Sequence, residues 1–174
     1  MSKAQADQEV WFMSNRQPWV FALTDCGLTS KTRSPFVTLS PRGSIVFLHA
    51  SKALWRGWEN LVWVDVYIHE HEMTPKDFEK SLVRGAVLAV ARVRAVGFTD
   101  DVMPESDFGF FDLVDIEAPW CLAWCGGEQT VVFEDIHVLR TPIFCRGAQV
   151  PTRKVPPEVL ASDEVQKILE EMRH

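Results

Sequence analysis

The chain has 174 residues, 47% of them hydrophobic, and a formal net charge of −6. This length fits one domain with one core, and the acidity argues against a protein that coats nucleic acid in general. The N-terminal stretch MSKAQADQEV is polar and no apolar run approaches the ~18 residues of a membrane span, so we expect a cytoplasmic protein without a signal peptide.

The first half of the chain contains a short helix and a buried strand. Residues 18–26 carry apolar side chains at helical spacing, with a proline at the start and Gly27 just after the end, which predicts a helix with one buried face. Residues 29–41 are rich in Ser and Thr and are predicted to form a loop. The β-branched and aromatic run at 44–49 predicts a buried strand, whereas residues 50–68 fit either a helix or a strand.

Two further helices are marked by their caps. Thr74, followed by a proline and then an acid at Asp77, is a good helix start, and this helix should end near Gly85. Near the C-terminus, Ser162 or Asp163 is expected to cap a helix over 164–172.

The remaining elements are strands and an acidic excursion at 99–118. Strands are predicted at 86–96, 122–124 and 130–139, with further short strands punctuated by Pro142 and Gly147. Helices and strands do not alternate as they do in a parallel sheet. We therefore expect the α+β class, with a small mixed β-barrel and short helices at its ends.

Charges of opposite sign occupy different segments of the chain. Residues 14–56 hold six cations and one acid, residues 95–139 hold ten acids and no Lys or Arg, and residues 140–154 hold four cations and no acid. A fold that brings the first and third segments together would create a basic patch on an acidic protein. The alternative is that these charges are scattered over the surface.

Several short motifs occur in an order that is typical of one family. They are Arg-Gln-Pro-Trp at 16–19, Gly27 with Arg-Ser at 33–34, Arg-Gly with a hydrophobic strand and His-Ala-Ser-Lys at 42–52, Gly-Ala-Val-Leu-Ala-Val at 85–90, Ala-Pro-Trp at 118–120, Val-Leu-Arg-Thr-Pro-Ile at 138–143 and Cys-Arg-Gly-Ala at 145–148. In this order they resemble the activating signal cointegrator homology (ASCH) domains. The resemblance implies a PUA-like fold, which is a small β-barrel with a cleft between the barrel and the first helix. We accordingly expect a flexible leader at 1–13, the ASCH domain at 14–157 and an added C-terminal helix at 158–174.

The resemblance also bears on activity. Family members are implicated in binding RNA or modified nucleosides, some small bacterial members hydrolyse acylated cytidine, and some are described as nucleases. In this chain Thr29 stands where the family motif has a lysine, and Arg92 stands where hydrolytic members carry an acid. These replacements remove the base and nucleophile pair that an amidohydrolase needs, so the resemblance leaves open whether the chain is an enzyme.

Charge pattern and resemblance together favour a cleft that binds a nucleotide or a short single-stranded RNA. Guanidinium groups match phosphates, and unstacked bases stack on aromatic rings. For Trp19 and His49 the alternative role is core packing, and for the arginines it is a structural ion pair. The predicted ligand-binding residues are Arg16, Gln17, Trp19, Arg33, Ser34, Arg42, His49, Ser51, Lys52, Trp120 and Arg146.

Two other functions stay open. A hydrolase in the same cleft would act on modified nucleosides such as acylated cytidine, or on RNA, and its weak catalytic candidates are Lys31, Thr29, Thr32 and His49. A protein-interaction adaptor would dock a protein partner or form a homodimer through the tryptophan-rich segment 55–63 or the C-terminal helix.

Cysteines and paired histidines form only weak metal patterns. His69 and His71 would share one face of a strand, and Cys121 lies four residues before Cys125, but neither pair has further ligands at zinc-site spacing. We expect no metal and no other cofactor. The four cysteines are expected to be free thiols in a reducing compartment, and they are Cys26, Cys121, Cys125 and Cys145.

Overall fold

The computed structural model describes residues 10–27, 30–33, 40–98, 129–149 and 151–173. These residues form a five-stranded mixed sheet in the order β1-β3-β4-β5-β2. Strand β1 is parallel to β3, and the other neighbouring pairs are antiparallel. The α+β class and the mixed sheet that the sequence predicted are confirmed. The strands are β1 (Val10–Gln17), β2 (Ser30–Arg33), β3 (Ile45–Leu54), β4 (Ala86–Phe98) and β5 (Gln129–Phe144).

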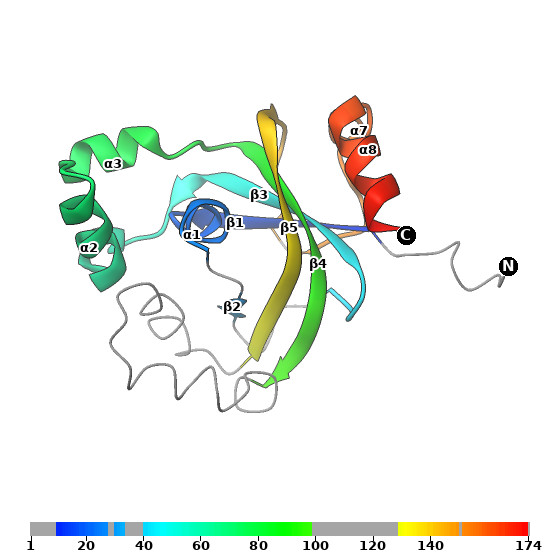
Figure 1. Ribbon diagram of the computed structural model, residues 1–174, viewed down its shortest axis with the longest axis horizontal. Helices are drawn as coiled ribbons and strands as arrows, with labels where there is room; N and C mark the ends of the chain where they lie inside the picture. The colour runs from blue at the N-terminus through cyan, green and yellow to red at the C-terminus, as the bar shows by residue number, and fades with distance from the viewer. Residues whose placement is uncertain (1–9, 28–29, 34–39, 99–128, 150, 174) are drawn as a thin grey trace, which may run out of the picture.

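Helices cover both faces of the sheet (Figure 1). On one side lie α1 (Trp19–Asp25), the short 3-10 helix η2 (Trp58–Asn60), α2 (Val62–Glu70) and α3 (Pro75–Ser81), and on the other lie α7 (Pro157–Leu160) and α8 (Asp163–Met172). None of the described helices is long and apolar enough to cross a membrane.

The sheet separates two hydrophobic cores. Successive residues of a strand point to opposite faces. Met13 and Leu48 therefore pack with the α1–α3 side, while Phe12 and Phe47 pack with α7 and α8. The apolar residues of α8 all face this second core, and they are Val165, Ile168, Leu169 and Met172.

The sheet is curved, and in the described residues it is open, with β1 and β2 at its edges. The register shifts once between β3 and β4 and three times between β4 and β5, and such bulges bend a strand. After β5 the chain crosses back to β1, where Thr152 and Phe12 exchange backbone hydrogen bonds of 2.7 and 3.0 Å. The small β-barrel that the sequence predicted therefore corresponds, in the described residues, to a curved open sheet with a crossing segment at its β1 edge.

Two strands lie where the sequence did not predict them. Strand β1 begins at Val10, so residues 10–13, which the sequence assigned to a flexible leader, belong to the sheet. Trp11, Phe12 and Met13 are all buried because both faces of the sheet are covered, and a strand of this kind lacks the polar alternation that marks a half-exposed one. Strand β2 lies within the segment 29–41 that was predicted to be a loop.

The ambiguous segment and the caps are also resolved. Strand β3 runs to Leu54, and the segment that fitted either a helix or a strand then becomes η2 and α2. Strand β5 is continuous across Pro142, where separate short strands were expected. The predicted caps are confirmed, since the hydroxyl of Thr74 accepts a hydrogen bond from Asp77 N and that of Ser162 accepts one from Val165 N.

Candidate functional site

A pocket forms where three strands end together. Ala86, at the start of β4, lies opposite Ala50 of β3 on one side and opposite Phe144 of β5 on the other. Strands β3 and β5 both run antiparallel to β4 and therefore towards its start; β3 continues past that point to Leu54, and β5 ends level with it at Phe144. Lys52 lies two residues after Ala50 and Arg146 two residues after Phe144, so two cations from distant segments emerge at the same end of the sheet.

The pocket has a volume of about 840 Å³, which falls within the ~300–1,000 Å³ typical of small-molecule sites. It contains no Asp or Glu among its described lining residues. One cation comes from each of the two basic sequence segments, which is one of the two arrangements that the charge pattern left open. The lining residues are Ser14, His49, Ser51, Lys52, Ala53, Gly85, Phe144, Cys145, Arg146, Gly147, Ala148 and Gln149.

A hydrogen-bonded chain of two side chains forms one wall of the pocket. Ser14 of β1 lies opposite His49 of β3 in the parallel register, and Ser14 Oγ is 2.9 Å from His49 Nδ1. His49 Nε2 lies 3.3 Å from the carbonyl oxygen of Cys145, and the backbone N–H of Ala148 donates to Ser14 Oγ at 2.9 Å. The segment after β5 is therefore fixed to β1 and β3 at two points.

These contacts define the protonation of His49. The Cys145 carbonyl can only accept, so Nε2 carries the proton and Nδ1 accepts a hydrogen bond from the Ser14 hydroxyl. Burial lowers the pKa of His49, and hydrogen bonds to the backbone of Cys145 and Gly85 oppose this shift only in part. The imidazole is only 1% exposed and is neutral at pH 7.

Two glycines permit this arrangement. A Cβ on Gly147 would lie 2.7 Å from His49 Cε1 and 2.8 Å from Ser14 Oγ, so only glycine lets the crossing segment pack against the pair. Gly85 has a φ of +76°, and a Cβ there would lie 3.1 Å from Lys52 Cγ. The aliphatic part of Lys52 thus lies against Gly85.

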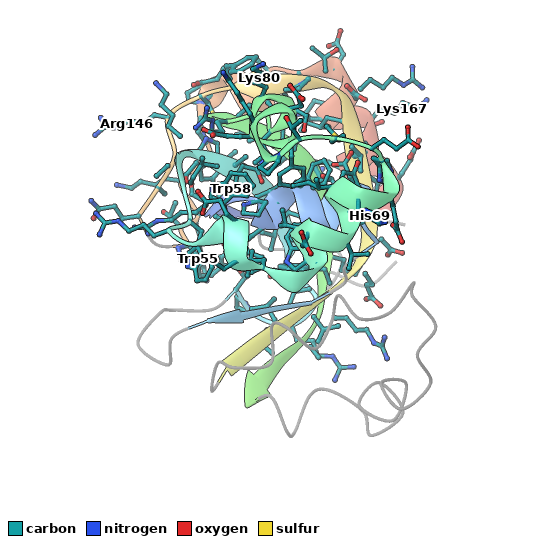
Figure 2. All side chains as sticks on the ribbon, turned by 90° about the vertical axis from the view of Figure 1, so that its left-hand side faces the viewer. Trp55, Trp58, His69, Lys80, Arg146 and Lys167 are labelled. Carbon is teal, nitrogen blue, oxygen red and sulfur yellow. The ribbon has the colours of Figure 1, made fainter. Side chains whose placement is uncertain are left out.

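The outer part of the pocket is aromatic and basic. Phe144 is 70% exposed, the largest exposure among the exposed large hydrophobic side chains of the described residues. Arg146 projects from the segment after β5, on the opposite side of the molecule from His69 and Lys167 (Figure 2).

Burial raises the pKa of Cys145 to about 11, with Glu158 adding to the shift and a hydrogen bond with the backbone of Val87 opposing it. The Cys145 thiol therefore stays protonated at neutral pH.

Four residues that the sequence predicted for ligand binding line this pocket: His49, Ser51, Lys52 and Arg146. Ser51 Oγ donates to the carbonyl of Ala53 at 3.1 Å.

His49 and Ser14 belong to the sheet face that carries Phe12, whose ring centroid is 5.3 Å from that of His49. The pocket thus lies on the face opposite to α1, whereas the sequence placed the cleft beside the first helix.

Gln17 and Trp19 have structural contacts away from the pocket. Gln17 is fully buried, its Oε1 accepts from the N–H of Phe21 at 3.0 Å, and its Nε2 donates to the carbonyl of Val83 at 2.7 Å. The Trp19 ring is 7% exposed and packs against Trp55 and Trp63, with centroid separations of 5.5 and 6.0 Å. The core-packing alternative therefore describes Trp19.

The other predicted residues are dispersed. Arg16 is exposed on β1, and Arg42 is exposed in the turn before β3, at the opposite end of that strand from Lys52. Lys31, Thr32 and Arg33 lie on β2, which pairs with residues 129–132 at the start of β5 and hence at the far end of that strand from Phe144. Thr29, Ser34 and Trp120 lie outside the described residues.

Eight of the twelve described lining residues were not predicted as site residues from the sequence, and among them Ser14, Phe144 and Gly147 have specific roles in the pocket. The Cys-Arg-Gly-Ala motif at 145–148 pointed to Arg146, but no local sequence signal predicts that Gly147 packs against Ser14 and His49. Ser14 acquires its role only through the parallel pairing of β1 with β3, which joins residues 35 apart in sequence.

The weak metal patterns do not assemble in the described residues. His69 lies in α2 and His71 is its C-cap, and residues two apart in a helix do not face each other. The His71 ring instead stacks on Tyr67 at 3.9 Å. No group of three His, Cys, Asp or Glu side chains that could hold a metal occurs in the described parts of the chain. Cys26 and Cys145 are free thiols, and Cys121 and Cys125 lie outside the described residues.

Arg92, which differs from the acid that the resemblance implies for hydrolytic members, makes structural contacts. Its Nε donates to Asp135 Oδ2 at 3.3 Å, and a terminal nitrogen donates to the carbonyl of Met172. It therefore connects β4 and β5 to the end of α8.

No protein-family model and no curated protein matches the chain. Solved structures of the ASCH protein from Zymomonas mobilis are similar to it at 14% identity. One covers 94% of this chain and 96% of its own with a TM-score of 0.46, and two single-substitution variants cover 93–95% of this chain and 97% of their own with a TM-score of 0.45. The resemblance of this chain to ASCH domains is carried by the order of its motifs.

Proposed function

We propose that the pocket binds a nucleotide or the end of a short single-stranded RNA. The observation that carries the proposal is that Lys52, Arg146 and the exposed ring of Phe144 line the same pocket, whose described lining has no acid. A ligand with a negatively charged group and a flat apolar face satisfies both features.

The chemistry of the two parts is complementary. A guanidinium binds a phosphate through two parallel hydrogen bonds, and an ammonium provides a compact positive charge. An exposed aromatic ring stacks on any of the four bases, which contributes about 1–3 kcal/mol per base. The pocket therefore favours single-stranded or free nucleotides, whose bases are accessible, over a duplex.

Few phosphates would be bound by this site. If Lys52 and Arg146 each neutralise one phosphate of a single strand, binding should weaken only slightly as salt is added. A plot of the logarithm of the association constant against the logarithm of the salt concentration should have a slope of about −1.4. A weak slope is also expected from an acidic chain, because the surface beyond the pocket offers little attraction to a longer nucleic acid.

The test is calorimetric titration of the full chain with nucleosides, nucleoside monophosphates and short single-stranded RNA. Arg146→Ala should weaken the phosphorylated ligands and leave the nucleosides unaffected. Phe144→Ala should weaken both kinds of ligand about 5- to 140-fold, which corresponds to the loss of one stacked base. Lys167→Ala and Val138→Ala are matched controls, since they remove an exposed cation and an exposed apolar side chain away from the pocket lining.

Two outcomes would contradict the proposal. One is the absence of saturable binding by every ligand in the millimolar range with protein that unfolds cooperatively. The other is binding that Arg146→Ala and Phe144→Ala change no more than the two controls do, since the ligand would then occupy another site.

The described surface gives less support to a protein-interaction adaptor. Within the tryptophan-rich segment 55–63, Trp58 and Trp63 are buried at 5% and 2% exposure, and Trp55 alone is exposed, at 37%. The apolar face of α8 is also covered, because it packs against the sheet. Both segments proposed for docking thus use most of their apolar surface within the chain.

A further inference from the structure

The Ser14–His49 pair has the geometry of a nucleophile and its general base. Ser14 Oγ is 2.9 Å from His49 Nδ1, within the range required for proton transfer. The opposite ring nitrogen lies 3.3 Å from the Cys145 carbonyl, which holds the imidazole in the tautomer that accepts the serine proton. A serine, a histidine and a group that orients the histidine are the three parts of an activated serine.

Ser14 is the member of the pair that a ligand can reach, because it is half-buried, whereas His49 is buried behind it. Ser14 and His49 both line the 840 Å³ pocket, together with Lys52 and Arg146. Acyl transfer passes through a tetrahedral intermediate with a negatively charged oxygen, and positive charge placed in the site in advance stabilises that oxygen. The described lining contains no carboxylate that would oppose it.

We propose that Ser14 is a catalytic nucleophile that hydrolyses small carboxylic esters carrying an anionic group, with His49 as its general base. This inference goes beyond nucleotide binding and does not depend on it, because the reaction needs only an ester and water in the same pocket.

The reaction proceeds through an acyl-enzyme. Ser14 Oγ attacks the ester carbonyl carbon and its proton moves to His49 Nδ1. The carbon–oxygen bond to the alcohol then breaks, and the leaving alkoxide takes that proton. Water attacks the acyl-serine in the same way, giving its proton to His49, which returns it to Ser14 as the carboxylic acid leaves. The backbone carbonyl of Cys145 stabilises the transient imidazolium through its hydrogen bond to Nε2.

A purely structural pair would hold the segment after β5 in place and show no such reactivity. A fluorophosphonate distinguishes the two roles, since it phosphonylates an activated serine with loss of fluoride and does not react with an ordinary serine hydroxyl. We expect intact-mass analysis of the full chain to show one adduct, and peptide mapping to place it on Ser14.

Variants give the matching controls. Ser14→Ala should abolish the adduct, and His49→Gln should slow its formation at least 100-fold, whereas Ser81→Ala, on α3 and away from the pocket, should leave it unchanged. Thermal unfolding of each variant separates loss of reactivity from loss of fold. Ser14→Cys tests reactivity even if the Ser14 hydroxyl is needed for the fold, because the thiol replaces it at the same position. A thiol beside His49 should react with iodoacetamide faster than Cys26 or Cys145 in the same protein.

The pH profile provides an independent readout. The labelling rate should rise with a midpoint below pH 6.5, as His49 loses its proton, and stay level up to pH 8. Absence of an adduct in folded protein overturns the proposal, as does an adduct that persists in Ser14→Ala or a rate that is unchanged in His49→Gln. Nucleotide binding without labelling would support the proposed binding function and overturn the hydrolase proposal. Labelling without nucleotide binding would support the hydrolase proposal and overturn the binding function.

Discussion

Gly147→Ala tests whether the segment after β5 is held against the Ser14–His49 pair as described. The added Cβ would lie 2.7 Å from His49 Cε1, while ordinary contacts begin at 3.4 Å, so the two groups must separate by about 0.7 Å. His49 is 1% exposed and cannot move outward, so the segment itself must shift. Overpacking of this kind costs about 1–3 kcal/mol.

The shift also strains the hydrogen bonds that fix the segment. The bonds from Ala148 N to Ser14 Oγ and from His49 Nε2 to Cys145 O each contribute about 0.5–1.5 kcal/mol. Together with the overpacking, we expect the free energy of unfolding to fall by about 2–4 kcal/mol, which lowers Tm by roughly 4–15 °C for a chain of this size. Urea denaturation and thermal unfolding both measure this change.

Gly43→Ala is the matched control. Gly43 has a φ of +80° and no atom within 4 Å of its added Cβ, so alanine there strains only the backbone, by about 1–2 kcal/mol, far from the pocket. Gly43→Ala should keep nucleotide affinity, and Gly147→Ala should lose at least tenfold. A Gly147→Ala protein with wild-type stability and wild-type affinity would refute the packing described for this segment.

Three further predictions concern parts of the fold outside this contact. Thr74→Ala should lower the free energy of unfolding by about 1 kcal/mol in urea denaturation, because it removes the cap of α3. Arg92→Met should lower the free energy of unfolding by about 1–2 kcal/mol, because the hydrogen bond to the Met172 carbonyl is lost. Asp135→Asn should change it by less than about 1 kcal/mol, because the Asp135 carboxylate is 58% exposed. The pKa of His49 lies below its ordinary value of 6.5 in the folded chain, so the unfolded chain binds the proton at higher pH than the folded one does. Stability should therefore fall as the pH drops below about 6.5 towards the folded pKa, and denaturation curves of His49→Gln should lose this component of the pH dependence.

Local signals predicted the elements that depend on local chemistry. The cap at Thr74 lies where the sequence placed it, because a hydroxyl before a proline and an acid acts within one turn of the chain. The C-terminal helix was likewise predicted from its cap. Strand β1 was missed because its residues 11–13 are buried on both faces, and an apolar run of that length carries no period that separates a strand from other buried segments.

The position of the pocket depends on pairings that no local signal contains. Ser14 meets His49 through a parallel register across 35 residues, and it meets Ala148 across 134. The resemblance directed attention to the first helix, and hence to Trp19, which packs in the core on the other face of the sheet. Residue types alone could not decide between the two faces, because Trp19 and Phe144 are both aromatic and it is their exposure, 7% against 70%, that separates a core ring from a pocket ring.

The segregation of charge along the chain was informative because of the order of the strands. A cationic segment lies on either side of the acidic stretch in sequence, and separation in sequence alone predicts no contact between them. The strand that brings them together is β4, whose first residue pairs with β3 on one side and β5 on the other. The end of the first cationic segment and the start of the second therefore pass the same point. That point is Gly85, where a side chain would displace Lys52, and the nearby Arg146 then completes a basic site on a chain of net charge −6. An acidic chain is therefore compatible with an anionic ligand whenever the topology, and not the composition, determines which charges are neighbours.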